Sequence, residues 1–310
     1  MEHLKKNEVF ASILIVIAGG CWGMIGLFSR ALSEAGLESL QIGALRVLVS
    51  FGSLLIIILA TNPNQLRIRL RDMWLFIGSG VLSIAFFNVC YFMSIEENTL
   101  SLAAIILYTA PSLVILMSKI VFKEKITGKK LASLTLSFAG TFFAVGMFSH
   151  RIETSLYGMI VGLGSGLGYA LYSIFSRIAL RKYGSVTIMV YTFFFASMVL
   201  LPFSNPAKIY DVMVHTPTVL ISLFALGWLS TLIPFWLYTK GLEHLEVGKA
   251  ALLTFVEPVV ATITGVVAFH EALTAANSGG ILLIILSLVI LNIKFKIPIH
   301  QTASKDYNKV

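Results

Sequence analysis

The strongest chemical signal in this sequence is an acid next to a proline, Glu257-Pro258, inside a long apolar run. The run extends from about residue 247 to residue 269 and is long enough to cross a bilayer as a helix. Pro258 has no N–H group, so the carbonyl group of Thr254 loses its helical partner. A carboxyl group at mid-span costs roughly 3 kcal/mol on insertion scales, and it tends to face protein or water instead of lipid.

Two interpretations fit Glu257. It can be a protonated, hydrogen-bonded acid in a kinked packing helix. It can also contact a solute or carry a proton, and this interpretation is favoured because acids inside membranes mark functional pathways. The sequence therefore predicts that Glu257 is a binding residue and that Pro258 is a hinge.

The segment around Glu257 has a counterpart 147 positions earlier in the chain, where Pro258 aligns with Pro111. The same offset aligns, without a gap, Glu271 with Glu124, Phe269 with Phe122, Thr274 with Thr127, Tyr238 with Tyr91, Gly227 with Gly80 and residues 175–177 with 28–30. A constant offset across most of both halves indicates an internal duplication, with Pro111 as the second predicted hinge. Glu257 itself aligns with Ala110, so the acid belongs to one half only.

Composition places these signals in a membrane protein. Of the 310 residues, 57% are hydrophobic and 12% are charged, whereas a soluble chain carries about 25% charged residues. Ten spans are predicted, at roughly 9–29, 40–61, 74–95, 100–122, 130–148, 156–176, 186–203, 218–239, 247–269 and 277–293. The net charge of +8 comes from basic residues at the ends of these spans, so nucleic acid is not an expected partner.

Lysine and arginine residues predict the orientation of the chain. If the N-terminus is cytoplasmic, 19 of the 23 basic residues lie in cytoplasmic segments and 3 lie outside. Cytoplasmic segments of membrane proteins carry such an excess. Both termini, including a tail at 295–310, are therefore predicted to be cytoplasmic in a multi-pass protein of the plasma membrane.

The two halves, 9–148 and 156–294, contain five spans each. An odd number of spans forces the second half to enter the membrane in the opposite sense to the first. The predicted fold is an all-α integral membrane protein with ten transmembrane helices in two inverted five-helix repeats. Inverted repeats of this kind build transporters whose site lies at mid-membrane between the halves.

Polar and aromatic side chains at mid-span are the candidate lining of such a site. Besides Glu257, they include Asn88, Trp22, Tyr108, Tyr169 and Trp236. For each aromatic residue alone, packing or an interfacial position is the more ordinary role. Asn88 needs partners deep in its span, which an interhelical hydrogen bond or a cavity supplies. Arg46, near the end of its span, is expected to form a structural ion pair or a helix-end contact.

Motifs of enzymes and of nucleotide-driven pumps are absent from the sequence. It contains no His-Glu-x-x-His, no Gly-x-Ser-x-Gly, no phosphate loop and no Gly-x-Gly-x-x-Gly. The two cysteines, Cys21 and Cys90, lie in different apolar runs and predict neither a disulfide framework nor a metal site. We therefore expect no enzyme activity, no cofactor and no transport driven directly by ATP hydrolysis in this chain.

Each half also contains the motif Glu-x-x-Thr, at 124–127 and at 271–274, just before its last span. Thr127 and Thr274 are predicted to cap the helices that follow, because a threonine hydroxyl accepts from the first exposed N–H groups of a helix. The motif is interpreted as a structural turn in preference to a solute contact.

The ten spans and the endings of the two halves resemble the drug/metabolite transporter superfamily, specifically its EamA-type members. The residues that carry this resemblance are Pro111 with residues 122–127, Glu257-Pro258 with residues 269–274, Trp22-Gly23, Arg46, residues 169–172 and Ser176-Arg177. The resemblance covers nearly the whole chain. It implies a central cavity lined mainly by the first, third, fourth, sixth, eighth and ninth spans, and members that move amino acids, other small metabolites or drugs.

The predicted function is a secondary transporter that exports a small polar metabolite, such as an amino acid or a related compound, by alternating access. Its partners are the solute and the lipid bilayer, with transport either downhill or coupled to protons, in a monomer or a homodimer. Uptake of an amine such as choline is the alternative, because aromatic faces attract such cations. A channel is less favoured, because channels need a continuous pore that is usually lined by rings from several subunits.

Overall fold

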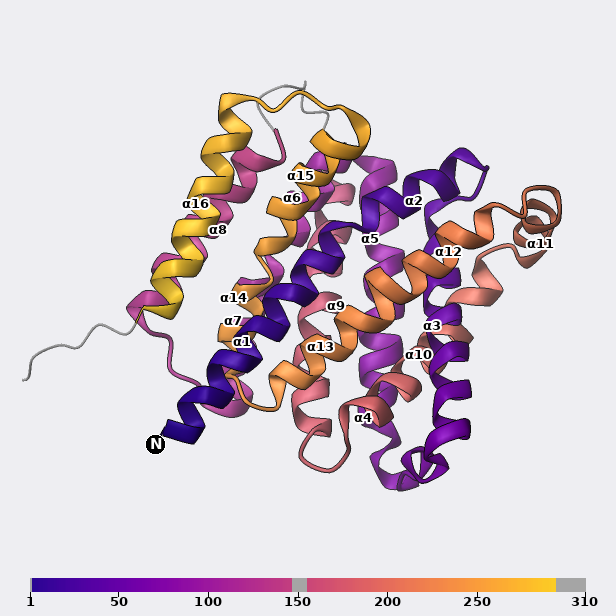
Figure 1. Ribbon diagram of the computed structural model, residues 1–310, viewed down its shortest axis with the longest axis horizontal. Helices are drawn as coiled ribbons and strands as arrows, with labels where there is room; N and C mark the ends of the chain where they lie inside the picture. The colour runs from indigo at the N-terminus through magenta and orange to yellow at the C-terminus, as the bar shows by residue number, and fades with distance from the viewer. Residues whose placement is uncertain (1, 147–154, 294–310) are drawn as a thin grey trace, which may run out of the picture.

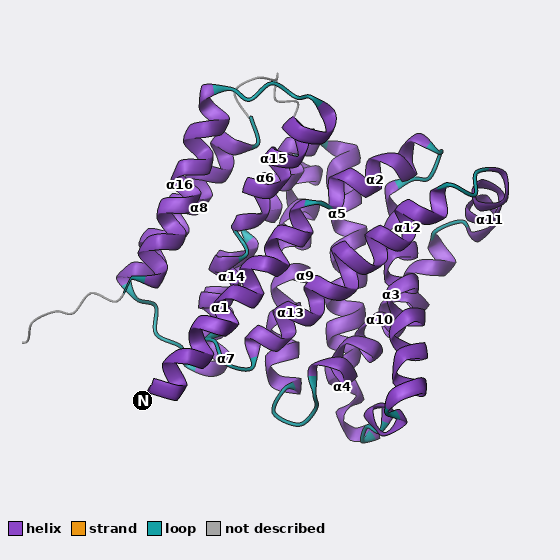
Figure 2. Ribbon diagram, viewed as in Figure 1, coloured by secondary structure: helices purple, strands orange, loops and turns teal. Residues whose placement is uncertain are grey.

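The structure is a computed structural model that describes residues 2–146 and 155–293. These described residues are almost entirely helical (Figure 2). Nine helical segments in them are long and apolar enough to cross a bilayer, and α8, with 17 residues, is the tenth. The predicted all-α membrane fold is confirmed. The predicted tail at 295–310, and the outer ends of the two predicted repeats at 148 and 294, lie outside the described residues.

The helices of the first half form five spans. They are α1 (Glu2–Gly23) with α2 (Ile25–Glu34); α3 (Ser39–Thr61); α4 (Met73–Ile77), the π-helical segment η3 (Gly78–Ala85) and α5 (Phe86–Glu97); α6 (Leu100–Leu107) with α7 (Ala110–Phe122); and α8 (Gly128–Ala144). Two single 3-10 turns, η1 (Pro63–Leu66) and η2 (Leu70–Asp72), connect α3 to α4.

The second half repeats this order. Its helices are α9 (Leu156–Ala179); α10 (Ser185–Phe203); α12 (Val219–Gly227), the π-helical segment η5 (Trp228–Leu232) and α13 (Ile233–Leu242); α14 (Val247–Leu253) with α15 (Val256–Phe269); and α16 (Ala275–Asn292). One additional helix, α11 (Pro206–His215), lies between the seventh and eighth spans at the right of Figure 1 and was not predicted from the sequence.

Local details of the two halves agree at the offset of 147 residues. Both third spans contain a π-helical segment, and both fourth spans are broken in two. Lys123 (φ 58°) and His270 (φ 55°) both adopt left-handed backbone at the end of the fourth span. Thr127 and Thr274 both accept a hydrogen bond from the backbone of the helix that follows, so both predicted caps are confirmed.

The helices also pack in equivalent pairs across the two halves. α1 packs against α13 and α15, and its counterpart α9 packs against α5 and α7. α3 and α10 pack against each other, and α8 packs against α16 at the left of Figure 1. This packing is that of two inverted five-helix repeats, as predicted.

Basic residues gather at one end of the bundle, where α1 begins and where α7, α9 and α13 end (bottom of Figure 1). We call this the basic end, and it is defined by Lys119, Lys123, Lys125, Lys129, Arg177, Arg181 and Lys182. The opposite end is the one where α5 and α15 end.

The first and ninth spans lie in close contact at Gly23. A Cβ atom at Gly23 would lie 2.6 Å from the backbone oxygen of Glu257 and 2.7 Å from the Cβ atom of Val260. At Gly20, on the same helix, a Cβ atom would lie 3.7 Å from Val260, which is an ordinary contact. Gly23 therefore lets the backbone of α1 lie directly against the first turns of α15.

We expect Gly23→Ala to destabilise the protein by about 1–3 kcal/mol, because the added methyl group meets backbone that cannot move aside. Gly20→Ala is the matched control and should be neutral or slightly stabilising, since alanine favours helix. Thermal unfolding of the two purified variants in detergent measures the difference. Equal unfolding temperatures would contradict the close approach at Gly23.

Candidate functional site

Glu257 lies in the first turn of α15, directly after the break in the ninth span. The carbonyl oxygen of Thr254, which Pro258 deprives of its helical partner, accepts from the backbone nitrogen of Glu257 at 2.9 Å. The hydroxyl of Thr254 donates to the carbonyl oxygen of Ala251 at 2.8 Å. The break therefore satisfies its own backbone groups and places the Glu257 side chain, which is half-buried, at mid-span.

The fourth span breaks at the equivalent position, and this break supplies Tyr108. The Tyr108 hydroxyl lies within interaction distance of the Glu257 carboxyl group. The Tyr108 ring stacks on Phe255, with ring centroids 6.0 Å apart. The two broken helices thus bring an acid from one half next to a phenol from the other half.

Arg46 of α3 joins the same cluster. Its guanidinium group interacts electrostatically with Glu257 and with Tyr91. Its Nη2 donates to Oδ1 of the buried Asn88 at 3.3 Å, and Nδ2 of Asn88 donates to the carbonyl oxygen of Ile84 at 2.6 Å. The structure therefore brings Asn88, Tyr108 and Glu257 together through Arg46, for which sequence reasoning had expected only a structural or helix-end role.

The two opposite charges are close but not in direct contact. Arg46 and Glu257 do not appear among the ion pairs of the described residues, which extend to N–O distances of 4.0 Å. Both side chains are half-buried, as are Tyr91, Tyr108 and Tyr169, which also interact with Glu257. The guanidinium group of Arg46 and the carboxyl group of Glu257 therefore interact within the bundle at a separation greater than that of a salt bridge.

An aromatic cluster lies behind Tyr169. Trp22 of α1 is only 6% exposed, and its ring contacts Tyr169, Phe235 and Tyr238 at centroid distances of 6.2, 5.3 and 5.5 Å. The Tyr238 hydroxyl forms a hydrogen bond with Ser173 at 2.6 Å. Trp22 thus packs behind the polar cluster and supports Tyr169.

Trp236 is the predicted site residue that the structure does not bring to this cluster. Its side chain is 42% exposed, as are, to a similar degree, Ile233 of the same helix and Leu229 of the preceding segment η5. Phe235, the preceding residue, contacts Trp22 in its place. One residue corresponds to roughly 100° of rotation around a helix, so a prediction that is one position off places a side chain on a different face.

Pro111 and Pro258 occupy equivalent positions in the first turns of α7 and α15, and both are buried. Each lies directly after the break in its span. A hinge is defined by motion between states, so the role of Pro111 and Pro258 as hinges stays a prediction.

Comparisons with known proteins add a family to this geometry. Residues 9–146 and 156–293 both match the family described as the EamA-like transporter family. A protein of Archaeoglobus fulgidus, named "Uncharacterized transporter", is 28% identical over 285 residues, which are 91% of this chain and 96% of that protein. A "Probable amino-acid metabolite efflux pump" of Escherichia coli is 23% identical over 92% of this chain and 94% of its own length.

Two further matches extend the comparison. An "Uncharacterized inner membrane transporter" of Salmonella typhimurium is 21% identical over 90% of this chain and 94% of its own length. A solved crystal structure with 18% identity has the same fold, at a TM-score of 0.75 over 91% of this chain and 96% of that chain.

Proposed function

This chain belongs to the EamA-like transporter family, and from that premise we propose that it exports a small zwitterion, such as an amino acid or a related metabolite. The protein is a multi-pass membrane transporter. We propose further that it lies in the plasma membrane with the basic end in the cytoplasm, that it moves its solute outward, and that it has no enzyme activity. Transport proceeds by alternating access, in a monomer or a homodimer.

The observation that carries the proposal is the separation of Arg46 from Glu257. A buried charge is costly unless a partner compensates it. An amino acid offers a carboxylate to the guanidinium of Arg46 and an ammonium group to Glu257, and it fills the space between them with charge-assisted hydrogen bonds. The hydroxyl of Tyr108 supplies an additional polar contact next to Glu257.

Two observations support export through the plasma membrane. The N-terminus lies at the basic end, and 19 of the 23 lysines and arginines belong to segments predicted to lie on the same side as the N-terminus, an excess that marks the cytoplasmic side. One relative is named as an efflux pump for amino-acid metabolites and another as an inner membrane transporter. If transport is coupled to protons, Glu257 is the acid at mid-span that exchanges them.

The proposal is tested by comparing cells that express the wild type, the double variant Arg46→Gln/Glu257→Gln, or an empty vector. Mass spectrometry of metabolites inside and outside the cells should show one class of amino acids leaving only wild-type cells, by roughly tenfold or more over the controls. Equal external profiles in all three strains would overturn export of a native metabolite.

Uptake of an amine such as choline is the alternative function, and Arg46 argues against it. A solute without a carboxylate leaves the guanidinium group unpaired next to a bound cation. Purified protein in liposomes separates the options. Saturable counterflow of an amino acid supports the proposal, whereas saturable choline flux supports the alternative, and flux without saturation or counterflow indicates a channel.

A further inference from the structure

An acid of the first half holds a helix of the second half at the basic end. Glu124 lies between α7 and α8, and its carboxylate accepts from the backbone nitrogens of Val247 at 2.7 Å and Gly248 at 3.0 Å. These are the first two residues of α14, whose exposed N–H groups have no partner within their own helix. The contact therefore joins the two halves through a backbone cap.

Lys130 reinforces this contact. Its Nζ lies 3.5 Å from the Glu124 carboxylate and 2.8 Å from the carboxylate of Glu246, which directly precedes α14. The side chains of Lys130 and Glu124 are only 6% and 10% exposed, so solvent screens this ion pair weakly.

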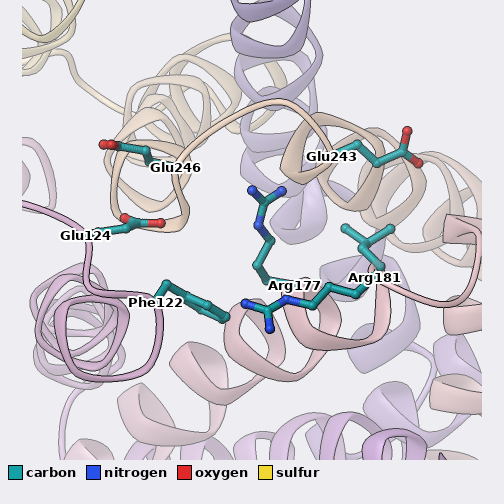
Figure 3. Close-up of a pocket in the computed structure, with 7 residues that line it drawn as sticks. Phe122, Glu124, Arg177, Arg181, Glu243 and Glu246 are labelled. Atoms are coloured by element: carbon teal, nitrogen blue, oxygen red, sulfur yellow. The ribbon is translucent and has the colours of Figure 1, made fainter.

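A pocket of about 440 Å³ lies beside the contact, and Glu124 and Glu246 lie together on one side of it (Figure 3). Its lining consists of Phe122, Glu124, Arg177, Leu180, Arg181, Glu243 and Glu246. The guanidinium group of Arg177 donates to the carbonyl oxygen of Leu242, where α13 ends. The connection from α13 to α14 is thus fixed at its start by Arg177 and at its end by Glu124.

For the equivalent acid at the opposite end, Glu271, the described part of the chain shows no such contact. The turn before this acid has the same backbone hydrogen bond. The backbone nitrogen of Glu124 donates to the carbonyl oxygen of Ser118 at 3.3 Å, and the backbone nitrogen of Glu271 donates to that of Gly265 at 3.2 Å. The Glu271 side chain, however, is exposed and lies over Gly265 in its own half. The α6 helix, the counterpart of α14, is capped by its own Thr99, which accepts from the backbone nitrogen of Leu102 at 3.2 Å.

Whole helices show the same asymmetry. α14 packs against α7 and α8 of the other half. Among the described residues, its counterpart α6 does not pack comparably against α15 or α16. The halves are therefore joined at the basic end by a contact whose acid has an equivalent, Glu271, at the opposite end, whereas Lys130 and Glu246 correspond to Asn277 and Thr99.

We propose that Glu124 and Glu271 are the two gate residues of the transport cycle. In the state described here Glu124 closes the basic end. In the alternate state Glu124 releases α14, and Glu271 turns away from Gly265 to cap the first residues of α6. Inverted repeats can exchange conformations in this way, because the two states are then related by the symmetry of the repeats. This inference rests on the alternating access of the proposed function.

Distances between spin labels test the gate without any solute. Labels at Lys125 and His244, both exposed, report on the basic end. Their equivalents, Ala272 and Glu97, report on the opposite end and are also exposed. The labels are placed in a variant in which Cys21 and Cys90 are replaced. Double electron–electron resonance then measures the distance between the two labels at each end.

The two acids should shift the population in opposite directions. Glu124→Ala should raise the ratio of open to closed basic ends by roughly tenfold, which is the effect of losing hydrogen bonds to a charged group. Glu271→Ala should lower that ratio, because it removes the cap of the alternate state only. Glu243→Ala is the control. Glu243 directly follows α13 and pairs with Lys240 of that helix at 2.7 Å, so its loss should leave both distances unchanged.

Shifts in the same direction, or no shift in either variant, would overturn the gate. Because no solute is used, a failure of the zwitterion assignment leaves this test intact. Conversely, an unchanged distance distribution would leave solute binding between Arg46 and Glu257 untouched.

Discussion

Arg46→Gln should abolish recognition of solutes that carry a carboxylate and leave recognition of simple amines, whereas Glu257→Gln should do the reverse. Each variant removes one partner of a charge-assisted contact and keeps the other. Removing one partner of a buried charged hydrogen bond costs about 2–5 kcal/mol, which corresponds to roughly thirty-fold or more in affinity. The solute class thus follows from two single substitutions.

Competition measurements with matched ligands make this prediction sharp. An amino acid carries both an ammonium group and a carboxylate. Its methyl ester keeps only the ammonium group, and its N-acetyl derivative keeps only the carboxylate. The ester should compete for Arg46→Gln and the N-acetyl compound for Glu257→Gln, in each case better than the parent amino acid competes. Equal loss of all three ligands in both variants would assign the two charges a structural role.

The measurement needs a charge variant that is remote from the cluster. Lys208→Gln serves, because Lys208 pairs with Glu38 at 2.7 Å and both side chains are well exposed. All three ligands should compete for this variant as they do for the wild type. Arg46→Gln also leaves Oδ1 of Asn88 without its guanidinium partner, so thermal unfolding of this variant must be recorded to separate lost binding from lost stability.

Most of the fold could be predicted because its signals are one-dimensional. Apolar runs, basic residues at their ends and a constant offset of 147 residues can all be counted along the chain. The break near Pro258 was also predictable, since proline removes a specific hydrogen bond. The helix α11 was not, because it lies outside the spans and carries no comparable pattern. The two π-helical segments also gave no signal in the sequence.

The rotation of the helices could not be predicted, and this limits what sequence says about the site. Where apolar residues cover every face, periodicity does not identify the inner one. Arg46 was therefore expected at a helix end, and Trp236 was selected although Phe235 faces the cluster. Polar residues that need partners were the more reliable guides. Asn88 and Glu257 both interact with Arg46.

Pro258→Ala should slow transport roughly tenfold while leaving the protein folded and at least as stable as the wild type. In the structure the carbonyl oxygen of Thr254 accepts from the backbone of Glu257, three residues along the chain. Alanine at position 258 supplies the N–H group that a continuous helix needs at this carbonyl. Proline costs a helix interior about 3 kcal/mol relative to alanine, so its removal favours the fusion of α14 with α15.

A fused helix would affect transport through Glu257 itself. The break keeps Glu257 in a first turn, beside Tyr108 from the other broken helix. Fusion would move this carboxyl group around the helix and stiffen the span that changes shape in the cycle. Pro111→Ala should act in the same direction, because Pro111 holds the equivalent break between α6 and α7.

Flux into liposomes and thermal unfolding in detergent, measured on the same preparations, decide whether the break is a hinge. Pro206→Ala is the matched control, because Pro206 starts the exposed helix α11, where proline fits the first helical position. The flux and the unfolding temperature of this variant should equal those of the wild type. Slower flux with unchanged or higher stability in Pro258→Ala identifies a break that is kept for motion, since stabilisation at a moving element costs activity. Wild-type flux in that variant would mean that the break only packs α15 against α1, and that the movement between states occurs elsewhere in the repeats.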